Sequence, residues 1–321
     1  MTDMPRPQLR PREVDSAIFG KDIMGGSHEP LYCGVLSFMR RRLTRNLAGV
    51  DVAVWGIPFD AAVSNRPGAR FGPQSVRRAS ALLEGDPQYP FRADPFAKLA
   101  VIDYGDCSLD YGRHFDVPYQ IEGQASEIIE QGAKLLSIGG DHYVTWPLLK
   151  AHARKHGPMA LVQFDAHQDT WFDEDVRIDH GSFVARAVRE GIILPEHSIQ
   201  IGIRTHAPDT CGLEIIYGED VEALGVSGVV ERIKARTGSM KTYLTFDIDC
   251  MDPAFAPGTG TPVAGGLSSR EALMILRRLG FLDIAGADVV EVAPAYDHAD
   301  ITSIAGAAVL QHYLGLLAER K

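Results

Sequence analysis

The chain has 321 residues, of which 45% are hydrophobic and 23% are charged, a composition typical of an ordinary globular protein. Its formal net charge of −10 argues against nucleic acid or an anionic membrane as a partner, because both need a basic surface. No stretch approaches the roughly eighteen uninterrupted apolar residues of a membrane span, and the N-terminal segment does not resemble a secretory signal. We therefore expect a cytoplasmic protein whose partners include neither nucleic acid nor a membrane.

Short apolar runs alternate with helical patterns through most of the chain. The runs predict strands at 52–56, 99–103, 134–138, 159–165, 198–202, 214–217, 241–247 and 284–292. Helices are predicted at 74–83, after the capping box formed by Ser268 and Glu271, and at 302–319. Near-continuous apolar strands separated by helices indicate a mainly parallel sheet that is buried on both faces.

Residues 1–50 match this alternation poorly, and no linker or repeat divides the rest of the chain. We predict a single domain spanning residues 1–321. Residues 1–50 are expected to form an N-terminal extension that packs on the core or on a neighbouring subunit.

Three predicted strands end in side chains that can bind a metal ion. Asp165, His167 and Asp169 are spaced by two, so an extended chain would point them to one face. Asp247 and Asp249 repeat this spacing after another apolar strand. His142 and its neighbour Asp141 follow Gly139 and Gly140, which allow a sharp backbone turn.

A single Asp-x-Asp at a strand end is usually a turn or capping feature. The Asp247 segment is not an EF-hand loop, because Asp252 stands where such a loop needs Gly and Gly258 where it needs Glu. Several strand ends in one sheet offer spaced ligands, however, and burying so many carboxylates without a cation would be prohibitively costly. The sequence therefore predicts a metal cluster.

The ligand set is four Asp and two His: His142, Asp165, His167, Asp169, Asp247 and Asp249. This set is too large for one tetrahedral ion and suits two ions bridged by carboxylates. Oxygen-dominated sites with two imidazoles and no thiolate favour Mn²⁺, with Co²⁺, Fe²⁺ or Zn²⁺ possible. Two such ions, about 3.5–4 Å apart, can lower the pKa of a shared water enough to make a nucleophile at neutral pH.

Four motifs in order resemble the ureohydrolase family of arginases, agmatinases and their relatives. They are GGDH at 139–142, FDAHQD at 164–169, DIDCMDPAFAPGTGTPVAGG at 247–266 and DVVEVAP at 288–294. Within the family, the sequence resembles agmatinases most, notably in IPFD at 57–60 and GARFGPQSVR at 68–77. The resemblance implies a three-layer α/β/α sandwich around an eight-stranded parallel sheet. It also implies a homo-oligomer, a trimer or a hexamer.

The resemblance assigns roles to the candidate residues. His142, Asp165, Asp169 and Asp247 would hold one Mn²⁺, and Asp165, His167, Asp247 and Asp249 would hold the other. His180 matches the family's proton-shuttling histidine, and Glu291 matches the carboxylate that grips the substrate guanidinium. Asp169 would steady the attacking hydroxide. The other histidines, including His152, His156 and His197, are expected to be solvated helix or loop residues.

The expected reaction is hydrolysis of a small cationic guanidino compound, most simply agmatine, to urea and an amine. Arginases carry an Asn shortly after the DAHxD motif that helps to hold the amino-acid head group, whereas Thr170, Trp171 and Phe172 stand there in this chain. The stretch 171–179 carries four acids against one Arg and would favour an amine over a carboxylate at the far end of the substrate, although Arg177 could instead serve a carboxylate. Three alternatives are a ureohydrolase for 4-guanidinobutyrate, a two-metal amide hydrolase and a non-catalytic metal-binding protein.

Overall fold

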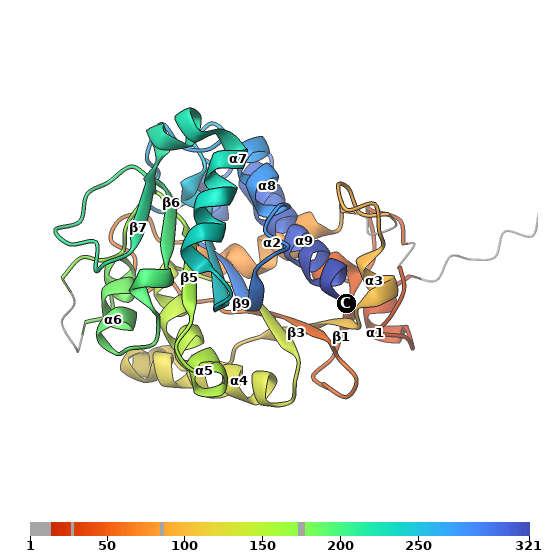
Figure 1. Cartoon of the computed structure of the whole chain (residues 1–321). Coiled ribbons are helices and arrows are strands. Elements are labelled where there is room, and N and C mark those ends of the chain that lie inside the picture. Colours follow the sequence, from red (N-terminus) through yellow and green to blue (C-terminus); the bar gives the residue numbers. More distant parts are fainter. Residues whose placement is uncertain (1–13, 27–28, 84–86, 173–176) are drawn as a thin grey trace, which may run out of the picture.

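The computed structural model describes residues 14–26, 29–83, 87–172 and 177–321 and shows one β-sheet with helices on both of its faces (Figure 1). Within the described residues the sheet has nine strands in the order β1-β3-β2-β4-β9-β8-β5-β6-β7. The strands are β1 (Arg42–Leu43), β2 (Val52–Gly56), β3 (Val101–Asp106), β4 (Lys134–Ile138), β5 (Ala160–Phe164), β6 (Ile199–Ile203), β7 (Glu214–Tyr217), β8 (Lys241–Asp247) and β9 (Asp283–Val290). All neighbouring strands run parallel.

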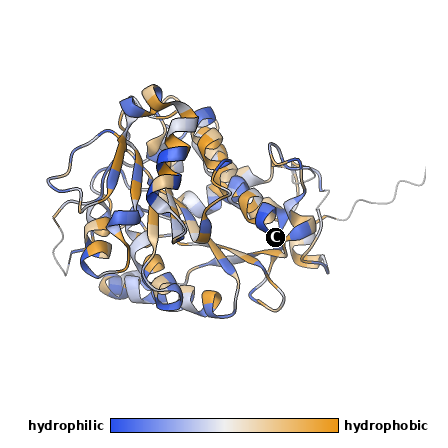
Figure 2. Cartoon of the chain, viewed as in Figure 1, coloured by the Kyte–Doolittle hydropathy of each residue, from blue (hydrophilic) through white to orange (hydrophobic). Residues whose placement is uncertain are grey.

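Helices cover the two faces of the sheet in separate layers. One layer contains α2 (Gly72–Ser80), α7 (Gly218–Thr237), α8 (Ser269–Leu276) and α9 (Ile301–Arg320), and the other contains α4 (Val117–Glu130), α5 (Thr145–His156) and α6 (Phe183–Arg189). The short helices α1 (Ser16–Phe19) and α3 (Pro95–Lys98) lie near the β1 edge (Figure 1). Each helix layer packs against the sheet through its own hydrophobic cluster. Both hydrophilic and hydrophobic residues occur along the helices (Figure 2). The predicted three-layer sandwich is confirmed.

The eight predicted strands are all present, four of them with the predicted bounds and the others shifted by one to three residues. The additional strand β1 has only two residues, which pair with Ile102 and Asp103 of β3. Next to it, Phe38 and Met39 are buried in the core, and the backbone N–H of Phe38 donates to the Asp103 carboxylate at 2.7 Å. The segment before β2 thus contributes both a strand and core side chains.

Local sequence signals explain where two of the helices begin. Ser268 caps α8, and its hydroxyl accepts from the Glu271 N–H while Glu271 accepts from the Ser268 N–H, which confirms the predicted capping box. Helix α2 has Pro73 in its first turn, where the missing N–H costs nothing. It ends at Ser80, earlier than predicted, and the Ser80 hydroxyl accepts from the backbone N–H of Met39.

Helix α9 is long and apolar enough to cross a membrane by length and composition. However, 83% of its most apolar window is buried inside the protein, where it packs against α2, α8 and β9. Its hydrophobic composition therefore reflects its place in the core.

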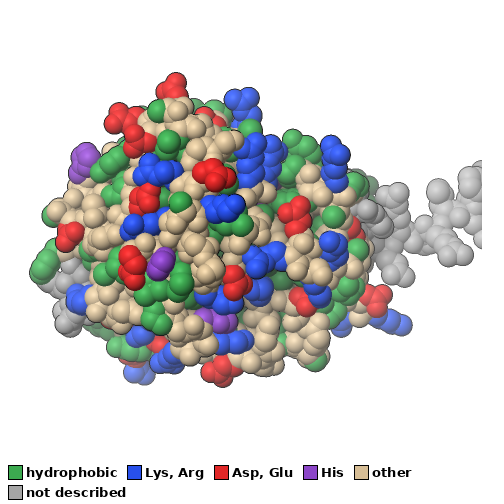
Figure 3. Space-filling view, in the orientation of Figure 1, with side chains coloured by type: hydrophobic (Ala, Val, Ile, Leu, Met, Phe, Trp, Pro, Cys, Tyr) green, Lys and Arg blue, Asp and Glu red, His purple; other side chains and the backbone are tan. Residues whose placement is uncertain are grey.

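On the face of the molecule shown in Figure 3, Lys and Arg side chains are interspersed with Asp and Glu.

His152 lies on the buried face of α5, so its prediction as a solvated residue is wrong. The side chain is 1% exposed, and neither ring nitrogen has a hydrogen-bond partner among the described residues. Gly286 makes room for the ring, since a Cβ there would lie 2.3 Å from Nε2. Burial, reinforced by His156, lowers the pKa of His152 to about 3.

The burial of His152 should make the stability of the folded protein depend on pH. Its pKa is about 3 in the folded protein and about 6.5 when unfolded, so the unfolded chain binds the extra proton as pH falls below 6.5. The folded state therefore loses stability towards acid, by about 2 kcal/mol between pH 8 and pH 5 from this group alone. Replacing His152 with Leu should remove that part of the pH dependence, as measured by chemical denaturation of metal-free protein. A stability difference between the two proteins that is the same at both pH values would contradict the assignment.

Candidate metal centre and active site

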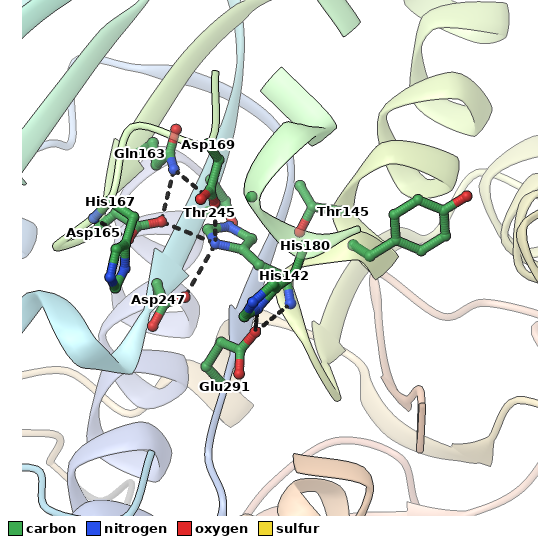
Figure 4. Close-up of polar contacts among 12 residues, drawn as sticks. His142, Thr145, Gln163, Asp165, His167, Asp169, His180, Thr245, Asp247 and Glu291 are labelled. Carbon is green, nitrogen blue, oxygen red and sulfur yellow. Dashed lines mark hydrogen bonds and ion pairs between the residues drawn. The ribbon is translucent and has the colours of Figure 1, made fainter. Parts of the chain in front are cut away.

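The predicted site residues lie at the carboxyl ends of four central strands that are neighbours in the sheet, β4, β9, β8 and β5. Ligands of open parallel sheets bind at this end. The structure brings all eight of the predicted side chains to this edge: His142 follows β4, Glu291 follows β9, Asp247 and Asp249 stand at the end of β8, Asp165, His167 and Asp169 follow β5, and His180 precedes α6. Figure 4 shows how most of them converge.

His142 is held by a tight turn and points one ring nitrogen into the cluster. A Cβ on Gly140 would lie 1.6 Å from the backbone oxygen of Phe59, so only glycine fits at that position. Nε2 of His142 lies 2.8 Å from the Thr245 hydroxyl, which orients the ring. Nδ1 faces three carboxylate oxygens, at 2.9 Å for Asp165 and 3.1 Å for both Asp169 and Asp247.

A second group of ligands adjoins the first. Nδ1 of His167 lies 3.1 Å from an oxygen of Asp249 and 3.4 Å from the second oxygen of Asp165. Asp165 therefore faces both groups, one with each oxygen. The two ligand groups thus share the Asp165 carboxylate.

The side chains converge through turns, and the expectation of an extended chain is wrong. After β5 ends at Phe164, the backbone N–H of His167 donates to Asp165 at 2.6 Å, and Asp169 has a left-handed φ of 51°. Asp247 likewise caps a short 3₁₀ turn and accepts from the Asp249 N–H at 2.8 Å. These Asx-type turns are what fold the ligands back over the strand ends.

The donor set fits divalent cations. His142 Nδ1 is buried, and none of the surrounding carboxylates is aligned for a hydrogen bond with it, although three lie within 3.1 Å. Burial and the Asp165 carboxylate raise the pKa of Asp169 to about 7, and burial with Asp249 and Asp165 raises the pKa of Asp247 well above its usual value. A cation among these groups would relieve the repulsion that raises both pKa values.

His180 and Glu291 form a pair beside this cluster. Nδ1 of His180 lies 2.8 Å from Oε1 of Glu291, and the same oxygen accepts from the backbone N–H of His142 at 2.8 Å. Glu291 has a φ of 62°, and its other oxygen, Oε2, is buried without a hydrogen-bond partner among the described residues. Such strained, under-satisfied carboxylates are typical of binding sites.

The protonation of His180 is set by its two neighbours. Burial alone would lower the pKa of His180, but the Glu291 carboxylate raises it to about 9. Because a carboxylate only accepts, Nδ1 carries a proton, and the exchangeable proton is the one on Nε2. Nε2 lies 2.8 Å from the hydroxyl and 3.1 Å from the backbone nitrogen of Ser64. The amide of Ser64 favours the neutral ring, whereas Glu291 favours the charged one.

A pocket of about 390 Å³ lies over the cluster. Its lining comprises Ser64, His142, His167, Asp169, Trp171, Phe172, Arg177, Asp179, His180, Gly181, Asp247 and Thr261. Arg177 and Asp179 form an ion pair at 3.0 Å. Of the stretch 171–179 predicted to select an amine, residues 173–176 lie outside the described residues.

Several residues of the site were missed by sequence reasoning. Gln163 and Thr245 each stand two positions before a candidate ligand Asp, in the buried parts of β5 and β8, and both contact the candidate ligands. A polar residue at that position in a buried strand is a signal that could have been used. Thr261 donates to Asp249 at 3.2 Å, and Ser64 contacts His180 from a distant loop, without any local signal.

The parallel α/β sheet gathers carboxylates and imidazoles at the carboxyl ends of its central strands, in groups that could hold a metal ion. The model of the arginase family matches residues 50–315. The chain belongs to the arginase family, and it is a ureohydrolase, an enzyme that hydrolyses the C–N bond of a guanidino group.

Individual relatives agree with this placement. An agmatinase of Chromobacterium violaceum is 50% identical over 309 residues, 96% of each chain, and one of Neisseria meningitidis serogroup C is 47% identical over 84% of this chain and 88% of the relative. Among solved structures, a hypothetical agmatinase from Burkholderia thailandensis superposes with a TM-score of 0.94 at 50% identity, covering 96% of this chain and 98% of the other. The proclavaminate amidino hydrolase of Streptomyces clavuligerus gives 0.85 at 38% identity, covering 91% and 100%.

Proposed function

We propose that the chain is a two-manganese hydrolase that converts agmatine to putrescine and urea. The observation that carries the proposal is the pair of adjoining ligand groups that share Asp165, with the unpartnered oxygen of Glu291 beside them. Curated relatives that are agmatinases at 44–50% identity support agmatine as the substrate.

His142, Asp165, Asp169 and Asp247 would hold one ion, and Asp165, His167, Asp247 and Asp249 the other, with Mn²⁺ favoured by the oxygen-rich donor set. When bound, two such ions lower the pKa of a water molecule so that it acts as a nucleophile at neutral pH. The protein residues supply the rest of the chemistry: they bind the substrate, orient it and move its protons.

Glu291 is proposed to bind the substrate guanidinium. Two donors occupy Oε1, which leaves Oε2 to accept an N–H of a planar guanidinium group. Asp169 stands on the other side of His142, where its carboxylate can accept a hydrogen bond from the attacking water. The guanidinium carbon would then lie between the Glu291 carboxylate and the attacking water.

His180 is proposed to deliver a proton to the leaving amine. It lines the pocket, and Nε2 is the ring atom that can gain and release a proton, although in the structure it accepts from the Ser64 N–H. Replacing His180 with Ala should keep both metal ions but lower kcat by about 10²–10⁴-fold, the usual contribution of general acid–base catalysis. Steady-state kinetics together with metal analysis checks this. Wild-type turnover with intact metals would show that His180 only shapes the turn before α6.

The far end of the pocket must distinguish the substrates, because agmatine, arginine and 4-guanidinobutyrate share the guanidinium group. Asp179 lines the pocket, and a carboxylate there attracts a protonated amine and repels a carboxylate. Arg177 also lines the pocket, and its guanidinium could pair with a carboxylate. This favours the second candidate, a carboxylated substrate such as 4-guanidinobutyrate. The pairing of Arg177 with Asp179 offsets both charges, so the preference for agmatine rests on the agmatinase relatives.

The substrate proposal is tested by kcat/KM on these three compounds at one pH and one salt concentration, after loading with Mn²⁺. We expect agmatine to exceed both others. A higher value for 4-guanidinobutyrate would transfer the assignment to the second candidate, and a higher value for arginine would overturn both.

A further inference from the structure

Gln163 is a buried amide placed between two of the proposed metal ligands. It lies in the middle of β5, where every residue is buried, and its own side chain is 0% exposed. Its Nε2 lies 2.7 Å from Oδ2 of Asp165, with a longer contact of 3.5 Å to Oδ2 of Asp169. Figure 4 shows the amide between these two carboxylates.

The orientation of the amide is fixed by a chain of hydrogen bonds. An ionised carboxylate only accepts, so the NH₂ group of Gln163 must face the two Asp side chains. Its Oε1 accepts from Nε2 of Gln200 at 2.7 Å, and Gln200 is its register partner on β6. Nε2 of Gln200 also donates to the backbone oxygen of Gln168 at 2.6 Å. Turning the Gln163 amide over would break its bonds on both sides.

The oxygens that Gln163 contacts are the ones that face the ligand histidine. His142 Nδ1 lies 2.9 Å from Oδ2 of Asp165 and 3.1 Å from Oδ2 of Asp169. The ligand atoms of His142, Asp165 and Asp169 all lie within 4.8 Å of one another. At that separation the two buried carboxylates repel each other, and they would rotate apart without a restraint. A neutral NH₂ group can restrain both without adding charge, and each oxygen keeps a second lone pair for a cation.

We propose that Gln163 is a positioning residue that sets the affinity of the site for divalent cations by holding Asp165 and Asp169 in place. The inference rests on the proposed function, because it takes these carboxylates as metal ligands. Outer hydrogen-bond partners of metal ligands contribute about 10–100-fold to metal affinity, which is the size of the effect expected here.

The experiment measures Mn²⁺ binding to the metal-free full-length protein by titration calorimetry, for the wild type and three variants. Gln163→Leu keeps the bulk of the side chain and removes the donor. Gln163→His restores an N–H, since an imidazole Nε2 reaches about as far from Cβ as the glutamine nitrogen does. Gln88→Leu is the matched control, because Gln88 is also a 0% exposed glutamine whose Nε2 donates to a backbone oxygen, of Gln311, away from the site.

We expect Gln163→Leu to weaken Mn²⁺ binding by about 10–100-fold, while Gln163→His and Gln88→Leu stay within about threefold of the wild type. At saturating Mn²⁺ the KM of Gln163→Leu should be unchanged, because the Gln163 side chain hydrogen-bonds to Asp165, Asp169 and Gln200 and to no residue proposed to bind the guanidinium. Equal affinity in Gln163→Leu and the wild type would overturn the inference, and so would a Gln163→His variant as weak as the Leu variant. A wild type that binds no Mn²⁺ would instead overturn the proposed function.

Discussion

Replacing Asp165 or Asp247 with Ala is expected to remove both metal ions and to lower kcat/KM by at least about 10³-fold, because the supply of a nucleophile at neutral pH depends on the ions. Asp165 faces His142 with one oxygen and His167 with the other. Losing it therefore takes a ligand from both proposed ion positions. His142→Ala removes a ligand from one position only, so it should retain more metal than either Asp variant.

Metal content per chain, measured on dialysed protein, checks this prediction beside the kinetics. Asp51→Ala is a suitable control, because Asp51 stands next to the start of β2, at the opposite end of the sheet, and binds the backbone N–H of Ala100. It should keep full metal content. Equal metal retention in Asp165→Ala, Asp247→Ala and the wild type would contradict the bridging assignment.

The second large effect is expected at Glu291. In Glu291→Gln the residue keeps its size and its backbone position but loses the charge that would pair with the guanidinium. Truncating one partner of a buried charge pair costs about 2–5 kcal/mol, so kcat/KM should fall roughly 30- to 5,000-fold. Metal content should not change, since Glu291 contacts the ligand His142 only through its backbone N–H.

Kinetics with agmatine and metal analysis of the same preparation separate these outcomes. A loss of metal in Glu291→Gln would show that the residue supports the cluster rather than the substrate. A kcat/KM within about twofold of the wild type would show that the guanidinium binds elsewhere.

The fold was predictable because its strands are buried on both faces. Strand β2 reads as a continuous apolar run, and β5 and β6 are apolar apart from one glutamine each; a buried parallel sheet produces that pattern. The two-residue strand β1 has no such pattern; its place is set by pairing with β3 and by the burial of Phe38 and Met39. Only tertiary structure could reveal it.

The site residues were predictable by type and spacing, but their geometry was not. Asp165, His167 and Asp169 converge through an Asx turn and a left-handed residue, which alternation along a strand cannot represent. Gln163 and Ser64 act through neighbours far away in the sequence.

The assignment of His152 to solvent was wrong for a different reason. The residue follows Leu148 and Leu149 at the spacing of a helix's apolar face, so its position should have outweighed its polarity. The homo-oligomeric state and the cytoplasmic location stay predictions.

The central claim is tested most directly by the product balance of the Mn²⁺-loaded protein with agmatine. Urea and putrescine should form in equal amounts, and EDTA-treated protein should form neither until Mn²⁺ is restored. Protein that carries two Mn²⁺ per chain yet releases no urea from any guanidino compound, or that releases ammonia in place of urea, would contradict the account.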